Sequence, residues 1–313
     1  MKRFLFFAFA LLASTIFFGC EEDPAVITTP TPPDDRPPVE TTLDFEVQTE
    51  VAPNEIRELN MEMANKNLRP TWIDGFRHKA GNSTQQYDEY LFNVVYTENE
   101  DNLDWHVFTD LTKIQLEEKL LTYGASGFRA LQVESYFKNG EARYAVILEE
   151  GDMSEQYFAI AKASGAYQAI FDDKVADGYR LLSRSVLYEG DERIITAHFG
   201  PNDIGSWVAF TTLDEDGIQA KMEQNKENGR MAAYLDVAQK GTTYHVRYSP
   251  IFTSEPHNNW YALNKLSSEE LEDEIESARN NGYQVTFVCG YDEFGLVNGN
   301  EVNFLRYAVG FKK

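Results

Sequence analysis

One serine and one lysine have a spacing that serine nucleophiles use with a lysine partner. Ser135-Tyr136-Phe137-Lys138 forms a Ser-x-x-Lys string, which is catalytic when the serine begins a helix and the lysine lies one turn later. Here the string runs from a predicted strand into a predicted hairpin turn, where alternation puts Ser135 and Lys138 on opposite faces. We therefore predict no catalytic residue in this string.

Histidines and acidic residues show no metal-binding pattern. None of the five histidines forms a close pair with zinc-like spacing. His198 and His245 lie on predicted returning strands that stacking would bring near each other, but ordinary structural histidines explain them better. Asp214-Glu215-Asp216-Gly217 lacks the spaced ligands of a calcium loop, and acidic residues favour a helix N-terminus. The sequence predicts no metal and no cofactor.

Two sets of residues recur at a regular spacing and are the candidate ligand-facing residues. The arginines share one register in three segments, and the aromatic residues share another: Arg69, Arg129, Arg180, Trp105, Tyr157, Trp207 and Trp260. Aromatic side chains with a few polar groups suit sugars or extended peptides. The simpler interpretation is packing, with each arginine covering a neighbour or pairing with an acid.

Cys20 is the residue with the clearest predicted chemistry. Lys2 and Arg3 precede an apolar run from Phe4 to Phe18, and Gly19-Cys20 closes it. This near-continuous run of fifteen residues is too short for a comfortable membrane span, so cleavage is expected. Gly-Cys at this place resembles the bacterial lipobox, although Phe17 and Phe18 depart from it. The sequence predicts a signal peptide over 1–19 and a lipid on Cys20 that binds the membrane.

The segment after Cys20 is predicted to be a tether. Residues 20–42 are rich in Pro and Thr and cannot bury enough apolar surface to fold. The cluster Glu21-Glu22-Asp23 resembles surface-export signals of some Gram-negative lipoproteins, and a solvated linker start explains it equally well. We expect an outer-membrane lipoprotein of the bacterial cell envelope, facing the periplasm or the cell surface. The formal charge of −23 argues against nucleic acid as a partner.

Residues 43–313 are predicted to form one domain of five repeats. Gly127, Gly178, Gly229 and Gly282 recur every 51 to 53 residues. Apolar residues stand seven and eleven positions before each glycine, on one helix face. Thr112, Ala163, Asp214 and Ser267 stand fifteen before it; all but Ala163 favour N-caps, and Thr112 and Ser267 have capping-box partners. Each glycine then suits the left-handed residue that ends a helix.

Two strands are predicted after each glycine. Asn139-Gly140 between apolar runs is a strong hairpin signal, and Glu189-Gly190 and Lys240-Gly241 repeat it. A weaker first copy has Asn67 in place of the glycine. The predicted helix–hairpin units cover residues 52–100, 109–158, 162–208, 213–261 and 266–313. We expect an α/β repeat protein, either a curved, half-barrel-like sheet with helices outside or, as the alternative, a closed five-fold propeller-like ring.

The repeats resemble the bacterial tandem-repeat domain that accompanies the serine hydrolase domain of polyglycine hydrolases. Its units run Gly-Tyr-Arg, hairpin, Arg-Tyr-Ala, aromatic residue and helix. The closest matches here are Gly178-Tyr179-Arg180, Gly127-Phe128-Arg129, Arg143-Tyr144-Ala145 and Arg306-Tyr307-Ala308. The fourth unit departs most, with Gly229-Arg230-Met231. In that family catalysis is attributed to the separate domain, so the resemblance implies a scaffold without catalytic residues.

Together these features favour a non-enzymatic binding module on a membrane tether, with an unknown protein, peptide or glycan as its ligand. The alternative is an extracytoplasmic hydrolase, or an accessory subunit of one, acting on peptide or polysaccharide. A pocket with two or more convergent titratable groups of shifted pKa would favour the enzyme. A broad concave aromatic face without such groups would favour binding.

Overall fold

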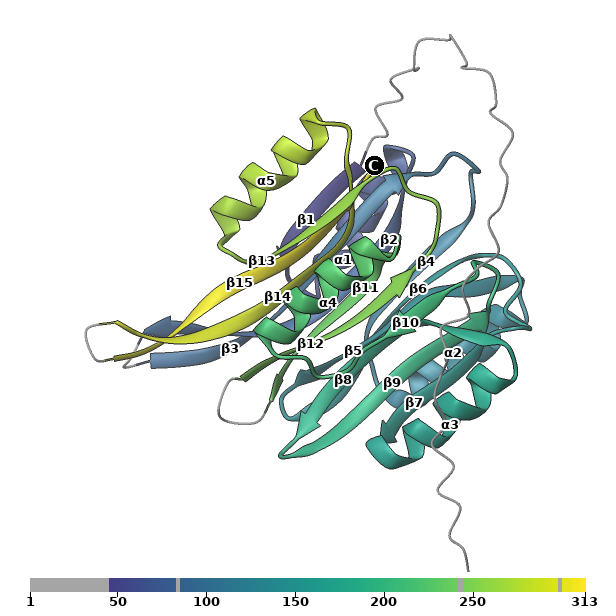
Figure 1. Cartoon of the computed structure of the whole chain (residues 1–313), viewed down its shortest axis with the longest axis horizontal. Coiled ribbons are helices and arrows are strands. Elements are labelled where there is room, and N and C mark those ends of the chain that lie inside the picture. The colour runs from purple at the N-terminus through teal and green to yellow at the C-terminus, as the bar shows by residue number, and fades with distance from the viewer. Residues whose placement is uncertain (1–44, 83–84, 241–244, 298–299) are drawn as a thin grey trace, which may run out of the picture. The chain divides into compact units, whose positions relative to one another are not determined.

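The computed structural model describes residues 45–82, 85–240, 245–297 and 300–313. The predicted signal peptide, Cys20 and the tether lie outside these ranges. Residues 42–313 group into one compact unit, and no described helix is long and apolar enough to cross a membrane. Five copies of strand–helix–strand–strand follow one another along the chain, as the colours of Figure 1 show.

Of the five helices in the described residues, three begin at a side-chain cap and two have no such cap. The helices are α1 (Ile56–Asn65), α2 (Lys113–Gly124), α3 (Ser164–Ala176), α4 (Glu215–Glu227) and α5 (Ser268–Asn280). Thr112 and Ser267 form complete capping boxes with Gln115 and Glu270, and Asp214 accepts from the Gly217 N–H. The four predicted glycines, and Asn67 in the first copy, have positive φ, which confirms the predicted helix ends.

Each unit holds three strands, one more than the sequence predicted. The additional strand comes before the helix and pairs with the last strand of its own unit, so that the last strand lies in the middle. Each unit therefore begins a few residues ahead of the predicted helix start. The sheets, in strand order, are β1 (Phe45–Val51), β3 (Gln85–Glu98), β2 (Leu68–Asn82); β4 (Trp105–Leu111), β6 (Glu141–Glu150), β5 (Phe128–Lys138); β7 (Tyr157–Ala163), β9 (Glu192–Pro201), β8 (Tyr179–Glu189); β10 (Trp207–Ala209), β12 (His245–Thr253), β11 (Met231–Lys240); and β13 (Trp260–Leu266), β15 (Asn300–Lys312), β14 (Gln284–Val297).

The five sheets are separate, which corrects the prediction of one curved sheet. No described strand pairs with a strand of another unit. The units meet instead through the first strand after each helix. These five inner strands contact one another in the cyclic order β2, β5, β8, β11, β14 and back to β2. In an open array the first and last units would lie apart, and β14 would not contact β2.

Polar side chains of the inner strands join each unit to the one before it. In four units the residue that makes this contact stands seven positions after the left-handed Asn or Gly that ends the helix, and in the second unit it is Gln132, five positions after Gly127. It reaches the backbone or a side chain of the preceding inner strand. The contacts are Gln132 Nε2 to Ile73 O (2.7 Å), Ser185 Oγ with Ser135 Oγ (2.7 Å), Val186 N to Asp236 Oδ2 (3.2 Å), Cys289 Sγ to Leu235 O (3.2 Å) and Gly290 N to Asp74 Oδ2 (2.8 Å). The hydrogen bonds therefore also run around a complete cycle.

Each helix shares its apolar face between its own sheet and the next one. Ile56 and Met63 of α1, for example, belong to one buried cluster with Tyr136, Ala145 and Ile147 of the second unit. A single unit could not cover this surface alone, because part of it is buried against side chains of the next unit. Neighbouring units therefore stabilise one another through burial as well as through the inner-strand hydrogen bonds.

Candidate functional site

The three candidate arginines pair with acids rather than lining a free surface. Arg69 Nη1 lies 2.5 Å from Glu149 Oε2, and Arg129 donates to Glu149 Oε1 from Nε at 3.0 Å and Nη2 at 2.7 Å. The Glu149 side chain is 2% exposed. Arg180 pairs with Asp203 at 3.3 Å and Glu255 at 3.7 Å. The arginines thus form ion pairs either with the next unit or within their own unit.

The four candidate aromatic residues do not form one stripe. Trp105, Trp207 and Trp260 share a register in their sheets, whereas Tyr157 is shifted by one residue and Gln156 takes its place. A one-residue shift turns a side chain to the other face of a sheet. Gln156 instead bonds the backbone N–H and C=O of Ala130. The side chain of Trp260 is also buried.

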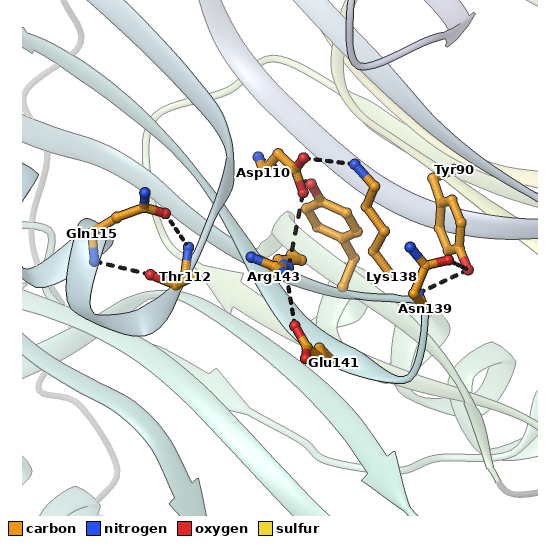
Figure 2. A network of polar contacts seen from close by, with 9 residues as sticks. Tyr90, Asp110, Thr112, Gln115, Lys138, Asn139, Glu141 and Arg143 are labelled. Atoms are coloured by element: carbon orange, nitrogen blue, oxygen red, sulfur yellow. Dashed lines mark hydrogen bonds and ion pairs between the residues drawn. The ribbon is translucent and has the colours of Figure 1, made fainter.

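Ser135 and Lys138 are kept apart, as the hairpin prediction implied. Ser135 is buried against Ser185, while Lys138 Nζ lies 2.6 Å from Asp110 Oδ2. Figure 2 shows Lys138 and Arg143 on either side of Asp110, and Tyr90 of the first unit beside Asn139 at the hairpin turn. These contacts hold the second hairpin in place and leave no nucleophile–base pair.

The histidines form no metal site. His198 is fully buried in β9 with no hydrogen-bond partner among the described residues, and it stacks on Phe158. Burial, and secondarily Arg180, lowers the pKa of His198 to about 3, so its ring is neutral. His245 is exposed at the start of β12, where it pairs with Lys240 of β11. No group of three or more His, Cys, Asp or Glu within the described residues is placed to hold a metal ion.

A small cavity of about 90 Å³ lies where the inner strands meet. Three carboxyl groups from three units line it: Asp74, Glu134 and Asp236. Burial raises the pKa of Asp74 to about 7 and raises those of Glu134 and Asp236 well above the ordinary range. The three acids stand at one repeat position, seven residues after Asn67, Gly127 and Gly229.

This cavity between the inner strands, called the axial cavity below, is too small for a peptide or sugar. A water molecule occupies about 30 Å³, so the space holds roughly three waters. Each carboxyl is also engaged, since Asp74 accepts from Gly290 and Asn93, Asp236 accepts from Val186, and Glu134 accepts from the Tyr234 hydroxyl. These acids were not predicted from the sequence, although their common register is a signal that could have found them.

A far larger groove, of about 770 Å³, lies at the junction of the first and second units. Its walls are α1, the loop over residues 99–104 and the strand β4. This volume is in the range of sites for small ligands. It contains one of the predicted residues, Trp105, whose side chain is half-buried. The groove was not predicted from the sequence.

The groove exists because α1 carries a polar residue where the other helices are apolar. Asn60 stands seven residues before Asn67, at the position of Leu120, Phe171, Met222 and Ile275. At the third junction Phe171 reaches Trp207, with ring centres 6.0 Å apart. Asn60 is too short to reach Trp105 in this way, and its Oδ1 accepts from the Tyr96 hydroxyl at 2.7 Å. The space that Phe171 fills at the third junction is left open here.

Several polar groups around the groove have no partner within the described part of the chain. They are the indole N–H of Trp105, the guanidinium of Arg57 and the carboxylate of Asp104. Met61 also lines the groove and is 61% exposed. An apolar patch with a few uncommitted donors and acceptors is the arrangement expected of a binding site, and it contains no nucleophile with an adjacent base.

Compared with known protein families, three regions of the chain match the polyglycine hydrolase-like structural repeat: residues 102–150, 163–193 and 257–308. These regions lie in the second, third and fifth units, and the first match begins just ahead of β4. The resemblance expected from the sequence is therefore confirmed for the repeats. Among the curated proteins, none matches this chain.

Proposed function

We propose that this array of polyglycine hydrolase-like structural repeats is a non-enzymatic binding module, held at the bacterial outer membrane by lipid on Cys20. In this proposal the five units form a closed, propeller-like ring with helices on its outer side, and the segment 20–42 is the tether. The cyclic contacts of the inner strands support the ring. The Gly19-Cys20 sequence after an apolar run supports the anchor.

The observation that carries the binding role is the groove between α1 and β4. Its volume is about 770 Å³, against about 90 Å³ for the cavity between the inner strands, and its uncommitted groups, Trp105, Arg57 and Asp104, come from both of its walls. A structural spacer has no reason to keep Asn60 where its other helices place large apolar residues, because filling this junction would bury more surface.

The test of binding is an array of glycans and peptides probed with the full chain in detergent. We expect retained ligands whose binding is lost when Ala64→Trp, at an exposed position on the groove wall, fills the space. Val175→Trp is the matched control, because Val175 is exposed and stands at the same position in α3. A blank array, or ligands indifferent to Ala64→Trp, would overturn the proposal.

The anchor has its own test. Cells grown with labelled palmitate should yield a labelled protein that sediments with membranes. The Cys20→Ala variant should lose the label and leave the membrane fraction. An unlabelled wild-type chain would show that the Gly19-Cys20 site is not lipidated, without bearing on the groove.

Hydrolysis is the second candidate, and the axial carboxyl groups favour it. Asp74, with a pKa of about 7, lines the same cavity as Glu134 and Asp236, whose pKa values burial also raises, and acids with raised pKa values are typical of general acid–base sites. Access would require the cavity to widen, since its present volume excludes a substrate. Turnover of any array ligand that is abolished by Asp74→Asn, while binding persists, would establish this role; no turnover would exclude it for that panel.

A further inference from the structure

The groove exposes the unpaired edge of a β-strand. Five consecutive residues of β4, from Trp105 to Thr109, line it. The strand order β4-β6-β5 leaves β4 at the edge of its sheet, paired on one side only. An edge strand presents a row of unused N–H and C=O groups that another chain can pair with.

The pairing register identifies which backbone groups face the groove. Glu150 N donates to Asp104 O at 2.8 Å, so residues 104 and 150 are a hydrogen-bonded pair. Hydrogen-bonded and non-bonded pairs alternate along an antiparallel ladder. Trp105 pairs with Glu149 and Val107 with Ile147, and both are therefore non-bonded pairs. Their N–H and C=O groups point away from β6 toward the free edge.

In the last unit, the backbone N–H at the same position of the edge strand already has a hydrogen-bond partner. Trp260 has the register of Trp105, and its N–H donates to the side chain of Asn259 at 2.9 Å. Asp104 precedes Trp105 as Asn259 precedes Trp260. No hydrogen bond among the described residues uses the backbone N–H of Trp105. In the fifth unit the side chain of Asn259 accepts from this backbone N–H, whereas in the second unit the equivalent N–H of Trp105 is available to a ligand.

The opposite wall constrains the side chains of an incoming strand. The residues of α1 that line the groove include Met61 and Ala64, which are exposed. A strand beside β4 would turn alternate side chains toward them. Those positions should be apolar, because Met61 and Ala64 offer no polar partner.

Opposite charges lie toward the two ends of the groove. Asn99 N donates to Asn67 O at 2.9 Å, so the C-terminal end of α1 lies beside the loop that leads into β4. Asp104 is at this end, whereas Arg57 is in the first turn of α1, toward the other. A ligand with a cation near Asp104 and an anion near Arg57 complements both charges.

We propose that the groove binds an extended peptide of about five residues, which adds a fourth strand to the second sheet along β4. Its main chain bonds to Trp105 and Val107, its inward side chains are apolar, and its two ends carry opposite charges. Five residues correspond to the roughly 15 Å of β4 that lines the groove. This inference rests on the proposed binding function and names its ligand class.

The test uses the full chain in detergent and a displayed library of random hexapeptides. A selected peptide is then synthesised with and without N-methyl groups at single positions. We expect binding to weaken at least tenfold on N-methylation of alternate residues only. Val107→Pro should have a similar effect, because it removes an N–H that faces the free edge and leaves the pairing with β6 intact. A thermal melt confirms that this variant folds.

The outcomes separate the two proposals. Peptide binding that is lost with Ala64→Trp but unaffected by Val107→Pro and by N-methylation would overturn strand addition and leave the binding module intact. Glycans bound in the groove with no peptide selected would do the same. Peptides indifferent to Ala64→Trp, in a chain that binds no glycan there either, would overturn the groove as a site altogether.

Discussion

Arg69 and Glu149, 80 residues apart in the sequence, form an ion pair across the first junction, with Nη1 2.5 Å from Oε2. Glu149 is almost fully buried, and Arg129 of its own unit contacts its other carboxylate oxygen. One acid therefore joins the first unit to the second. The consequence for stability can be measured because the two arginines differ in exposure.

Replacement of Glu149 by alanine should destabilise the fold by about 3 kcal/mol, because it leaves the partly buried Arg69 without its counter-ion. Arg129→Ala should cost less than about 1 kcal/mol, since that side chain is 49% exposed and the pair is screened by solvent. Urea unfolding monitored by circular dichroism provides the measurement. Asp203→Ala is the control: this partner of Arg180 is 69% exposed and its loss should change little. Equal effects of all three substitutions would contradict the prediction.

Filling the groove from its floor should weaken ligand binding without unfolding the protein. Asn60→Leu restores the apolar residue type found in the other helices, but it removes the acceptor for the Tyr96 hydroxyl. These effects oppose each other, so the free energy of unfolding should change by less than about 1.5 kcal/mol. Affinity for any ligand found on the arrays should fall at least tenfold. Glu62→Leu, on the same helix but away from the groove lining, should leave affinity unchanged.

The axial acids make stability depend on pH. The pKa of Asp74 is about 7 in the folded chain and 3.8 in a model peptide, so the folded state holds this proton more tightly. Stability is then greatest below pH 4 for this group and declines as pH rises from about 4 through 7. Glu134 and Asp236 act in the same direction. The urea midpoint should be lower at pH 8 than at pH 5, and Asp74→Asn should flatten this dependence. An unchanged slope in the variant would show that other groups cause it.

Cys289 should report on opening of the contact between β11 and β14. It is fully buried on β14, its thiol donates to Leu235 O, and burial raises its pKa well above the ordinary value. In the Cys20→Ala variant it is the single thiol of the chain. A thiol-alkylating reagent should leave the native protein unmodified and should modify it fully in urea. Rapid modification under native conditions would mean that the seam between β11 and β14 opens readily.

The sequence predicted the features that depend on neighbours in the chain. The caps at Thr112 and Ser267 and the left-handed glycines are short-range devices, and the structure contains them as expected. The strand before each helix was missed, because its pairing partner lies some 40 residues away, as with Trp105 and Glu149. The single curved sheet was wrong for a related reason. Strands that contact each other only through side chains have the same alternation of apolar and polar residues as strands that are hydrogen-bonded in one sheet. The sequence pattern is therefore the same in both arrangements.

The candidate site was harder to predict than the repeats. The arginines and aromatic residues stand out in the sequence because they recur, and residues that recur are those that every unit needs for packing. The groove depends on the opposite signal, which is the one helix where Asn60 replaces a large apolar residue. Tyr157 also carried a visible warning, since it stands six residues before its helix cap and the three tryptophans stand seven before theirs.

The cyclic contact of the inner strands sets an order for folding during synthesis. Trp72 donates its indole N–H to Val288 O across a separation of 216 residues. A chain that emerges N-terminus first can complete each sheet as soon as its third strand arrives. The first unit, however, waits for the fifth before its inner strand is covered. Until then an apolar surface around Trp72 is exposed to chaperones, proteases and other chains, and losing the last unit would make that exposure permanent.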